Sequence, residues 1–188
     1  MNEKRIRVCH ITSAHSSNDG RIFQKECRTL SENKRFEVFL VAQGKSRKEY
    51  GVKVIGVGDN TKGRLQRIVN ISNKVYRKAK CLNADIYHLH DPELLLYAKK
   101  LKKKGSIVIF DSHENYSEQI EKKDYLPLFL RKIVSILYKL FENYVVKRID
   151  AVIFTTTVNG ENPFSKRCKK TTIVGNYPIL DDRRRYIE

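Results

Sequence analysis

Residues 84–115, "ADIYHLHDPELLLYAKKLKKKGSIVIFDSHEN", contain the pattern that decides the fold. Two short runs rich in apolar, β-branched and aromatic residues, 85–90 and 106–112, read as strands. The segment between them repeats its apolar residues at helical spacing, at Leu94, Leu95, Ala98 and Leu101. A strand, a helix and a strand in this order form the unit of a parallel sheet, because a parallel connection needs a long crossover.

The same alternation extends over most of the chain. Further strands are predicted at 5–12, 36–43, 52–57, 150–156 and 171–176. Helical faces are marked by Phe23, Cys27 and Leu30, and by Ile68, Ile71 and Val75. This pattern predicts an α/β fold: a single Rossmann-like domain whose mostly parallel sheet carries helices on both faces.

Length and composition are consistent with one soluble domain. A chain of 188 residues can bury one sizeable core, and no segment approaches the roughly 20 apolar residues of a membrane span. The four cysteines form no CxxC pair, and the first residues contain no apolar signal-peptide core. We therefore expect free thiols and a cytoplasmic protein.

The net charge of +17 predicts an anionic partner. Nucleic acid, an anionic membrane face and phosphorylated metabolites all qualify. The basic runs 99–104, 166–170 and 183–185 are not interleaved with aromatic residues, and no zinc-finger, helix-turn-helix or RNP pattern occurs. We expect no nucleic-acid partner, although a basic α/β nucleic-acid-binding module remains the main non-enzymatic alternative.

Polar residues gather where the predicted strands end. They occupy 12–19, 88–93, 111–114 and 155–157. In open α/β sheets, ligands bind beyond the carboxyl ends of the strands, near the point where the strand order reverses. The sequence therefore predicts a binding site at this edge.

The pair His88 and His90 raises the question of a metal. Residues i and i+2 of a strand share one face, as zinc ligands do in HxH pairs. A binuclear hydrolase of the HxHxDH type would need a histidine at position 93, where Glu93 stands, and only three histidines lie elsewhere. A simpler interpretation makes Asp91 the cap of a helix that starts at Pro92.

Phosphate-binding loops are weakly represented. The stretch "GDNTKGR" (58–64) lacks the Lys-Ser/Thr ending of a phosphate loop, and no G-x-G-x-x-G follows the first strand. Asp19 is a candidate N-cap, after which Gly20 leaves room at the helix start and Arg21 could add a positive clamp. An ordinary capped helix explains the same residues equally well.

Residues 125–149 form the clearest amphipathic pattern. Apolar residues recur at i, i+3, i+4 and i+7, while Arg131, Lys132, Lys139 and Lys147 lie off this stripe. Such a helix can pack on the sheet as core, or it can place its apolar face on an anionic membrane surface. Both interpretations remain open from the sequence.

Several stretches together resemble a known family. "SSNDGRIFQKECRTL", the block 84–115 with its "HxHDPELL" and "DxHE" strand ends, "VIFTTT" and "VGNYP" resemble the N-terminal half of retaining glycosyltransferases of family 4, which have the GT-B fold. The resemblance covers nearly the whole chain, and the middle block is its most specific part.

The resemblance implies roles for individual residues. His113 would lie near the transferred sugar and stabilise charge, without any metal or cofactor in this chain. The acceptor side of the cleft would be shaped by His90, Asp91, Glu93, Asp111 and Glu114, and the loop of Asp19, Gly20 and Arg21 would face the donor phosphates or the acceptor.

The resemblance also implies a division of labour. Residues 1–176 would be the acceptor-side domain and 177–188 the start of a linker to a C-terminal domain, which holds the nucleoside-diphosphate sugar with two glutamates seven residues apart. Nothing like this nucleotide-sugar site lies in this chain, so we expect it to be inactive alone and to act with a donor domain in cis or in a separate chain. The expected acceptor is a saccharide or a lipid-linked molecule of envelope polysaccharide synthesis, reached peripherally on the inner membrane face. Half of a sugar-nucleotide epimerase remains an alternative.

Overall fold

The computed structural model describes residues 4–59, 67–102, 105–113, 116, 120, 127–158 and 160–178. Among the predicted features, Glu114, most of the loop 58–64, the helix start at 125–126 and the linker residues 179–188 lie outside the described residues.

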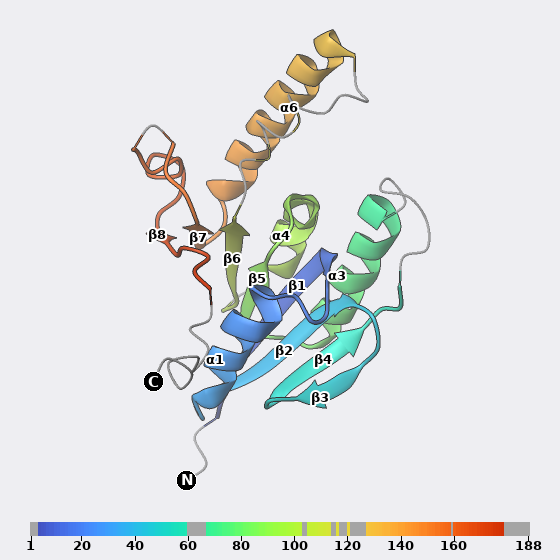
Figure 1. Cartoon of the computed structure of the whole chain (residues 1–188). Helices are drawn as coiled ribbons and strands as arrows, with labels where there is room; N and C mark the ends of the chain where they lie inside the picture. Colours follow the sequence, from blue (N-terminus) through green and yellow to red (C-terminus); the bar gives the residue numbers. More distant parts are fainter. Residues whose placement is uncertain are drawn as a thin grey trace, which may run out of the picture.

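One eight-stranded sheet organises the domain, in the order β3-β4-β2-β1-β5-β6-β7-β8 (Figure 1). All neighbouring strands run parallel except the pair β3 and β4. The strands are β1 (Ile6–Ser16), β2 (Phe36–Gln43), β3 (Arg47–Glu49), β4 (Val52–Gly56), β5 (Ile86–Leu89), β6 (Ile107–Ser112), β7 (Ala151–Phe154) and β8 (Thr171–Ile173). Each of the strands predicted from the sequence is present, so the predicted α/β fold with a mostly parallel sheet is confirmed.

Strand β3 was not predicted. Its three residues are Arg47, Lys48 and Glu49, which offer no apolar alternation. It pairs antiparallel with β4 at the end of the sheet. Charged side chains on a short edge strand discourage pairing with another molecule, which is why this strand lacks the usual sequence signal.

Helices cover both faces of the sheet, as predicted. On one face the π-helical turn η1 (Ile22–Cys27) and α1 (Arg28–Glu32) pack over β2 and β4, where Phe23 and Cys27 meet Leu40 and Val54. The opposite face buries the larger core. It is covered by η2 (Arg67–Ile71), α3 (Ser72–Cys81), η3 (Pro92–Leu94) and α4 (Leu95–Leu101).

Helix α6 (Leu128–Val146) projects from the body of the domain, and its last turns pack against that body (Figure 1). Val145 and Val146 are buried in the larger core. The apolar stripe predicted further up the helix is open to solvent instead, since Phe129 is 66% exposed and Leu140 is 61% exposed. This stripe is therefore not core. Within the described part of the chain, no helix is both long and apolar enough to cross a membrane.

The chain reverses direction in the sheet at β1. From β1 the chain adds β2, then the edge strand β3, and then β4 between β3 and β2, before it returns to place β5 on the other side of β1. The carboxyl ends of β1 and β5 consequently flank the switch point at which ligands of open α/β sheets bind.

Candidate functional site

Three histidines meet on one face of the sheet at the switch point. The β1–β5 register places His10 opposite His88, and His90 follows two residues later. The ring centroids of His10 and His88 lie 4.8 Å apart, and those of His88 and His90 lie 4.4 Å apart. All three side chains are buried. The sequence predicted the pairing of His88 with His90, but it gave no signal for His10.

The π-helical turn η1 aims two ionisable side chains, Arg21 and Glu26, at these histidines. The N–H of Glu26 donates to the carbonyl of Arg21, five residues earlier, at 3.0 Å. Nε of Arg21 lies 3.1 Å from Oε1 of Glu26. In an α-helix two residues five apart would point about 140° away from each other. The π-helical turn therefore lets both side chains reach the same part of the sheet, a use of π geometry that is frequent at functional sites.

Asp111 at the end of β6 joins this group. Arg21 donates to both of its carboxylate oxygens, from Nε at 2.9 Å and from Nη2 at 3.0 Å. Nδ1 of His90 lies 3.3 Å from Oδ2 of Asp111. Burial raises the pKa of Asp111, but the contacts with His90 and Arg21 outweigh burial and hold this pKa below its usual range. Asp111 is therefore an anion in the folded protein.

Burial sets the protonation of the other members. It raises the pKa of Glu26 to about 8, with a further contribution from the charge of Asp111. It lowers the pKa of His88 to about 3 and that of His90 to about 4, and it holds the pKa of His10 well below its usual value. The imidazoles are therefore neutral near pH 7 and keep their lone pairs.

Asp91 has a different partner from the one that the sequence predicted. It stands at the start of η3, before Pro92, but its side chain does not cap that helix. Its Oδ2 instead accepts hydrogen bonds from the hydroxyl of Thr12 at 2.8 Å and from the backbone N–H of Ser13 at 2.6 Å. The hydroxyl of Ser13 also donates to Glu93 at 2.9 Å. The capping prediction for the Asp91 side chain is wrong, because this side chain accepts its hydrogen bonds from Thr12 and Ser13 at the end of β1 instead.

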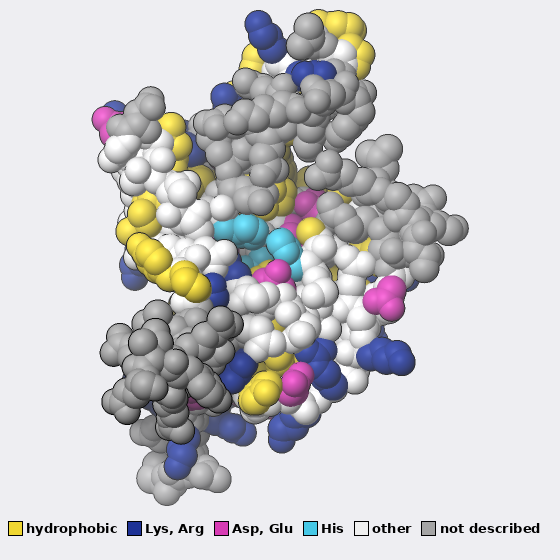
Figure 2. All heavy atoms as spheres, viewed as in Figure 1, with side chains coloured by type: hydrophobic (Ala, Val, Ile, Leu, Met, Phe, Trp, Pro, Cys, Tyr) yellow, Lys and Arg dark blue, Asp and Glu magenta, His cyan; other side chains and the backbone are white. Residues whose placement is uncertain are grey.

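His113 lies just beyond the end of β6, beside the buried cluster that Asp111 forms with the three histidines. Its Nδ1 is 3.9 Å from Oδ2 of Asp111, and its ring centroid is 5.3 Å from that of His15. Figure 2 shows histidine and acidic side chains together near the middle of this face of the molecule. A pocket of about 340 Å³ opens here. It is lined by His15, Asp19, Gly20, Arg21, Ile22, Lys25, His113 and Asn176.

The predicted loop of Asp19, Gly20 and Arg21 thus shares this pocket with His113. Oδ1 of Asp19 accepts the backbone N–H groups of Arg21 at 2.9 Å and of Ile22 at 2.8 Å, so Asp19 caps the helix start. The side chain of Arg21 is 8% exposed, and its guanidinium is held by Asp111. The charge of Arg21 is therefore matched inside the protein. Lys25 lies in the same wall at a more exposed position, where its Nζ donates a hydrogen bond to Oδ1 of Asn176.

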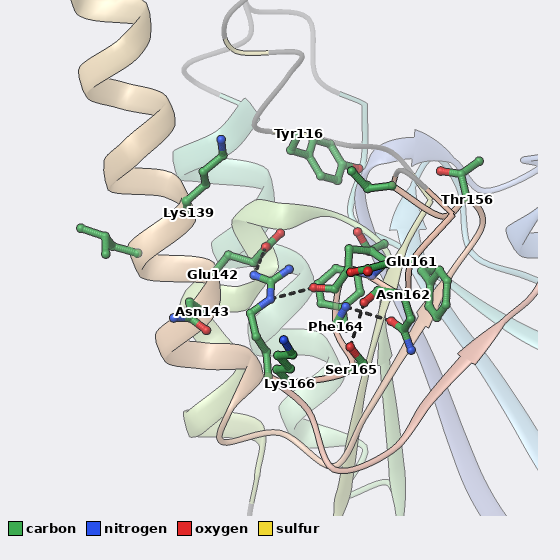
Figure 3. A pocket seen from close by; sticks show the side chains of 16 residues that line it. Tyr116, Lys139, Glu142, Asn143, Thr156, Glu161, Asn162, Phe164, Ser165 and Lys166 are labelled. Carbon is green, nitrogen blue, oxygen red and sulfur yellow. Dashed lines mark hydrogen bonds and ion pairs between the residues drawn. The ribbon is translucent and has the colours of Figure 1, made fainter.

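A second, larger pocket borders the same strand end (Figure 3). Its volume is about 820 Å³, and it lies between α6 and the segment 156–167. An ion pair of 2.8 Å joins Arg167 to Glu142, which also accepts a hydrogen bond from Tyr138. Ser112 and Tyr116 line it beside His113. The sequence did not predict this pocket, because 156–167 has no periodic pattern.

Comparison with known proteins agrees with the resemblance and with the fold. The model of a family described as Glycosyltransferase Family 4 matches residues 20–159. A structure of sucrose-phosphate synthase from Thermosynechococcus elongatus aligns with a TM-score of 0.63 and 13% identity, over 97% of this chain and 52% of that chain. A second structure of sucrose-phosphate synthase from that organism aligns with a TM-score of 0.56 and 10% identity, over 90% of this chain and 88% of that chain.

At these identities the two structures establish a shared fold. The chain spans about half the length of the first of them. The search of curated proteins gives no match.

Proposed function

Since the chain belongs to glycosyltransferase family 4, we propose that it forms the acceptor-binding half of a retaining glycosyltransferase. The complete enzyme would move a sugar from a nucleoside-diphosphate sugar to a hydroxyl of a saccharide or lipid-linked acceptor. Envelope polysaccharide synthesis is the setting that fits such an acceptor. A donor domain, in cis or in a separate chain, would hold the nucleotide, and this chain alone would be inactive.

The observation that carries this proposal is the position of His113 between two pockets: His113 lines the smaller one, and its chain neighbour Ser112 lines the larger one. The larger pocket, of about 820 Å³, is in the size range of sites for small organic ligands. Its wall offers hydrogen-bonding groups of the kind that bind sugar hydroxyls, among them Asn143 and Glu161. The smaller pocket holds His15 and Lys25, which suits the more strongly anionic donor. An acceptor in the first and a donor in the second would have their reacting atoms near His113.

His113 would position the sugar and stabilise charge that develops on it. Its backbone carbonyl accepts a hydrogen bond from the Thr155 hydroxyl at 3.0 Å, which fixes the strand end against the next loop. The Asp111 carboxylate lies behind the ring, 3.9 Å from Nδ1. Closure of a donor domain over this edge would align the two substrates and exclude water. Glu114, expected to shape the acceptor side, lies outside the described residues.

Helix α6 supports a membrane-associated acceptor. The larger pocket lies against α6, and the exposed stripe of that helix continues away from the pocket. Leu137 and Leu140 would enter the headgroup region, while Lys132 and Lys139 would contact anionic lipid. This arrangement would deliver a lipid-linked acceptor to the pocket on the cytoplasmic side of the membrane.

The His113→Ala variant tests the catalytic assignment. Sugar transfer from radiolabelled nucleoside-diphosphate sugars to membrane extracts is measured with the chain and its donor domain together. Loss of one charge-stabilising group predicts a fall in kcat of about 100-fold to 1,000-fold, with a smaller change in the donor KM. Unchanged thermal unfolding would show that the fold is intact. Transfer at a near-normal rate would reject the role of His113.

A binding experiment tests the acceptor half separately. The chain by itself is titrated with saccharide acceptors and with nucleoside diphosphates, and its backbone amide signals are followed by NMR. The acceptor is expected to shift signals of residues that line the larger pocket, such as Asn143 and Glu161. Binding of the nucleotide alone, without any acceptor effect, would assign this chain to the donor side instead.

A further inference from the structure

We propose that His10, Glu26, His88 and His90 form a binding site for a divalent transition-metal ion, with zinc as the ion that fits best. One ligand atom from each of the four side chains lies within 4.8 Å of those of the other three. This site goes beyond the proposed sugar transfer and does not depend on it.

The distances between the ligand atoms are close to those of a tetrahedral site. With zinc–nitrogen bonds of about 2.0–2.1 Å, neighbouring ligand atoms lie about 3.3 Å apart. Nδ1 of His10 lies 3.0 Å from Nε2 of His90. Oε2 of Glu26 lies 3.8 Å from Nδ1 of His10, 3.7 Å from Nδ1 of His88 and 3.8 Å from Nε2 of His90. The four atoms lie within 4.8 Å of one another, so binding would draw the most separated pair together by up to about 1.5 Å.

Hydrogen bonding among the described residues leaves this group incompletely satisfied. Oε2 of Glu26 is buried and accepts no hydrogen bond from them, and Nε2 of His10 and Nε2 of His88 are buried without a partner of this kind. The three imidazole nitrogens face Oε2 at 3.7–3.8 Å, which is too long for hydrogen bonds. A buried polar group usually has a partner, and a shared cation would supply one for Glu26.

The surroundings resemble the outer shell of a metal site. Nδ1 of His90 lies 3.3 Å from the Asp111 carboxylate, and Nε2 of the same ring faces Nδ1 of His10 at 3.0 Å, so a bound ion would replace this contact between the two rings. Metal-ligating histidines commonly have such a carboxylate behind them. Arg21 bridges Asp111 and Glu26, which holds both carboxylates in place.

The donor set selects the class of ion and its role. Three imidazoles and one carboxylate suit zinc better than magnesium or calcium, which prefer oxygen ligands. Four protein ligands leave no open position for water or substrate, which is typical of a structural site. The ion would tie η1 to β1 and β5 beneath the pocket of His113.

Zinc content is the first measurement. The purified chain is incubated with zinc chloride, desalted, and analysed by mass spectrometry of the metal. About one zinc ion per chain is expected in the wild type. Glu26→Gln and His88→Gln are expected to lose most of it, because each removes one ligand. His15→Gln is the matched control, since His15 lies outside the four-residue group, and it is expected to keep the zinc.

X-ray absorption at the zinc edge of the wild-type chain is the second measurement, and it does not depend on variants that fold. Scattering from nitrogen and oxygen ligands, including several imidazoles, would support the site. Sulfur ligands would overturn it, because they would assign the zinc to cysteines. Absence of bound zinc in the wild type would also overturn it and leave a water-filled polar cluster. Equal zinc loss in His15→Gln and His88→Gln would show nonspecific surface binding.

Discussion

Arg21 connects the two carboxyl groups beneath η1, those of Asp111 and Glu26. Its guanidinium binds both oxygens of Asp111 and also contacts Glu26, and it is almost fully buried. The sequence presented it only as a phosphate clamp beside Gly20. Its partner Asp111 lies 90 residues away along the chain, and no local pattern reports such a distant contact. The same limit hid the pairing of His10 with His88, since it depends on the register between two distant strands.

Substitution of Arg21 is expected to destabilise the fold strongly. Arg21→Ala leaves the Asp111 carboxylate buried without its cation, which typically costs about 3–5 kcal/mol. Arg21→Lys keeps a charge but cannot reproduce the two parallel hydrogen bonds, so an intermediate loss is expected. Both losses of stability are measured as changes in the free energy of unfolding in urea. Arg35→Ala, at an exposed position, should change it by less than about 0.5 kcal/mol. Equal effects of Arg21→Ala and Arg35→Ala would contradict this account.

At the scale of elements, the sequence predicted strands better than helices. Strands buried on both faces are continuous apolar runs with recognisable bounds, and this is why β5 and β6 were found within one residue of their ends. The exposed stripe of α6 has the same periodicity as a buried one, so the sequence could not tell core from surface there. The π-helical turn in η1 was also beyond prediction, because its residues fit an ordinary helical pattern.

The junction of α4, β6 and β7 provides a test of pH dependence. Asp150 accepts hydrogen bonds from Nζ of Lys102 at 2.6 Å and from the N–H of Val108 at 2.8 Å. Partial burial raises the pKa of Asp150, but these bonds outweigh burial and lower it below its usual value of 3.8. A lowered pKa stabilises the fold above the unfolded value, and this contribution is lost as the pH falls through the folded value.

Asp150→Asn is therefore expected to be less stable than the wild type near neutral pH, with a difference that shrinks below about pH 4. Urea midpoints at neutral pH and at about pH 3 measure this difference. Asp59→Asn, at an exposed position, is the control and should show a small effect at both values. If the difference in urea midpoint between Asp150→Asn and the wild type were the same at both pH values, the ionised Asp150 carboxylate would not be its cause.

At the scale of the whole molecule, we expect the net charge of +17 and the projecting helix α6 to favour binding to an anionic membrane surface together. The chain is expected to sediment with liposomes that contain anionic lipid and not with neutral ones, and the association should weaken as salt increases. Leu137→Glu with Leu140→Glu should abolish it, because both side chains are exposed on the stripe. The matched control Leu96→Glu replaces another exposed leucine, on α4. Equal sedimentation with both lipid types, or equal loss in the control, would contradict a membrane face on α6.

The position of β1 in the middle of the sheet has a consequence for synthesis on the ribosome. Its first partner, β2, follows within about 20 residues, whereas its second partner, β5, begins only at Ile86. A nascent chain that has completed β4 can therefore pair only one side of β1. The other side remains an open parallel edge until β5 emerges, and such an edge can recruit a foreign strand. We therefore expect misassembly, and a need for chaperones, in the interval between the emergence of Gly56 and that of Leu89.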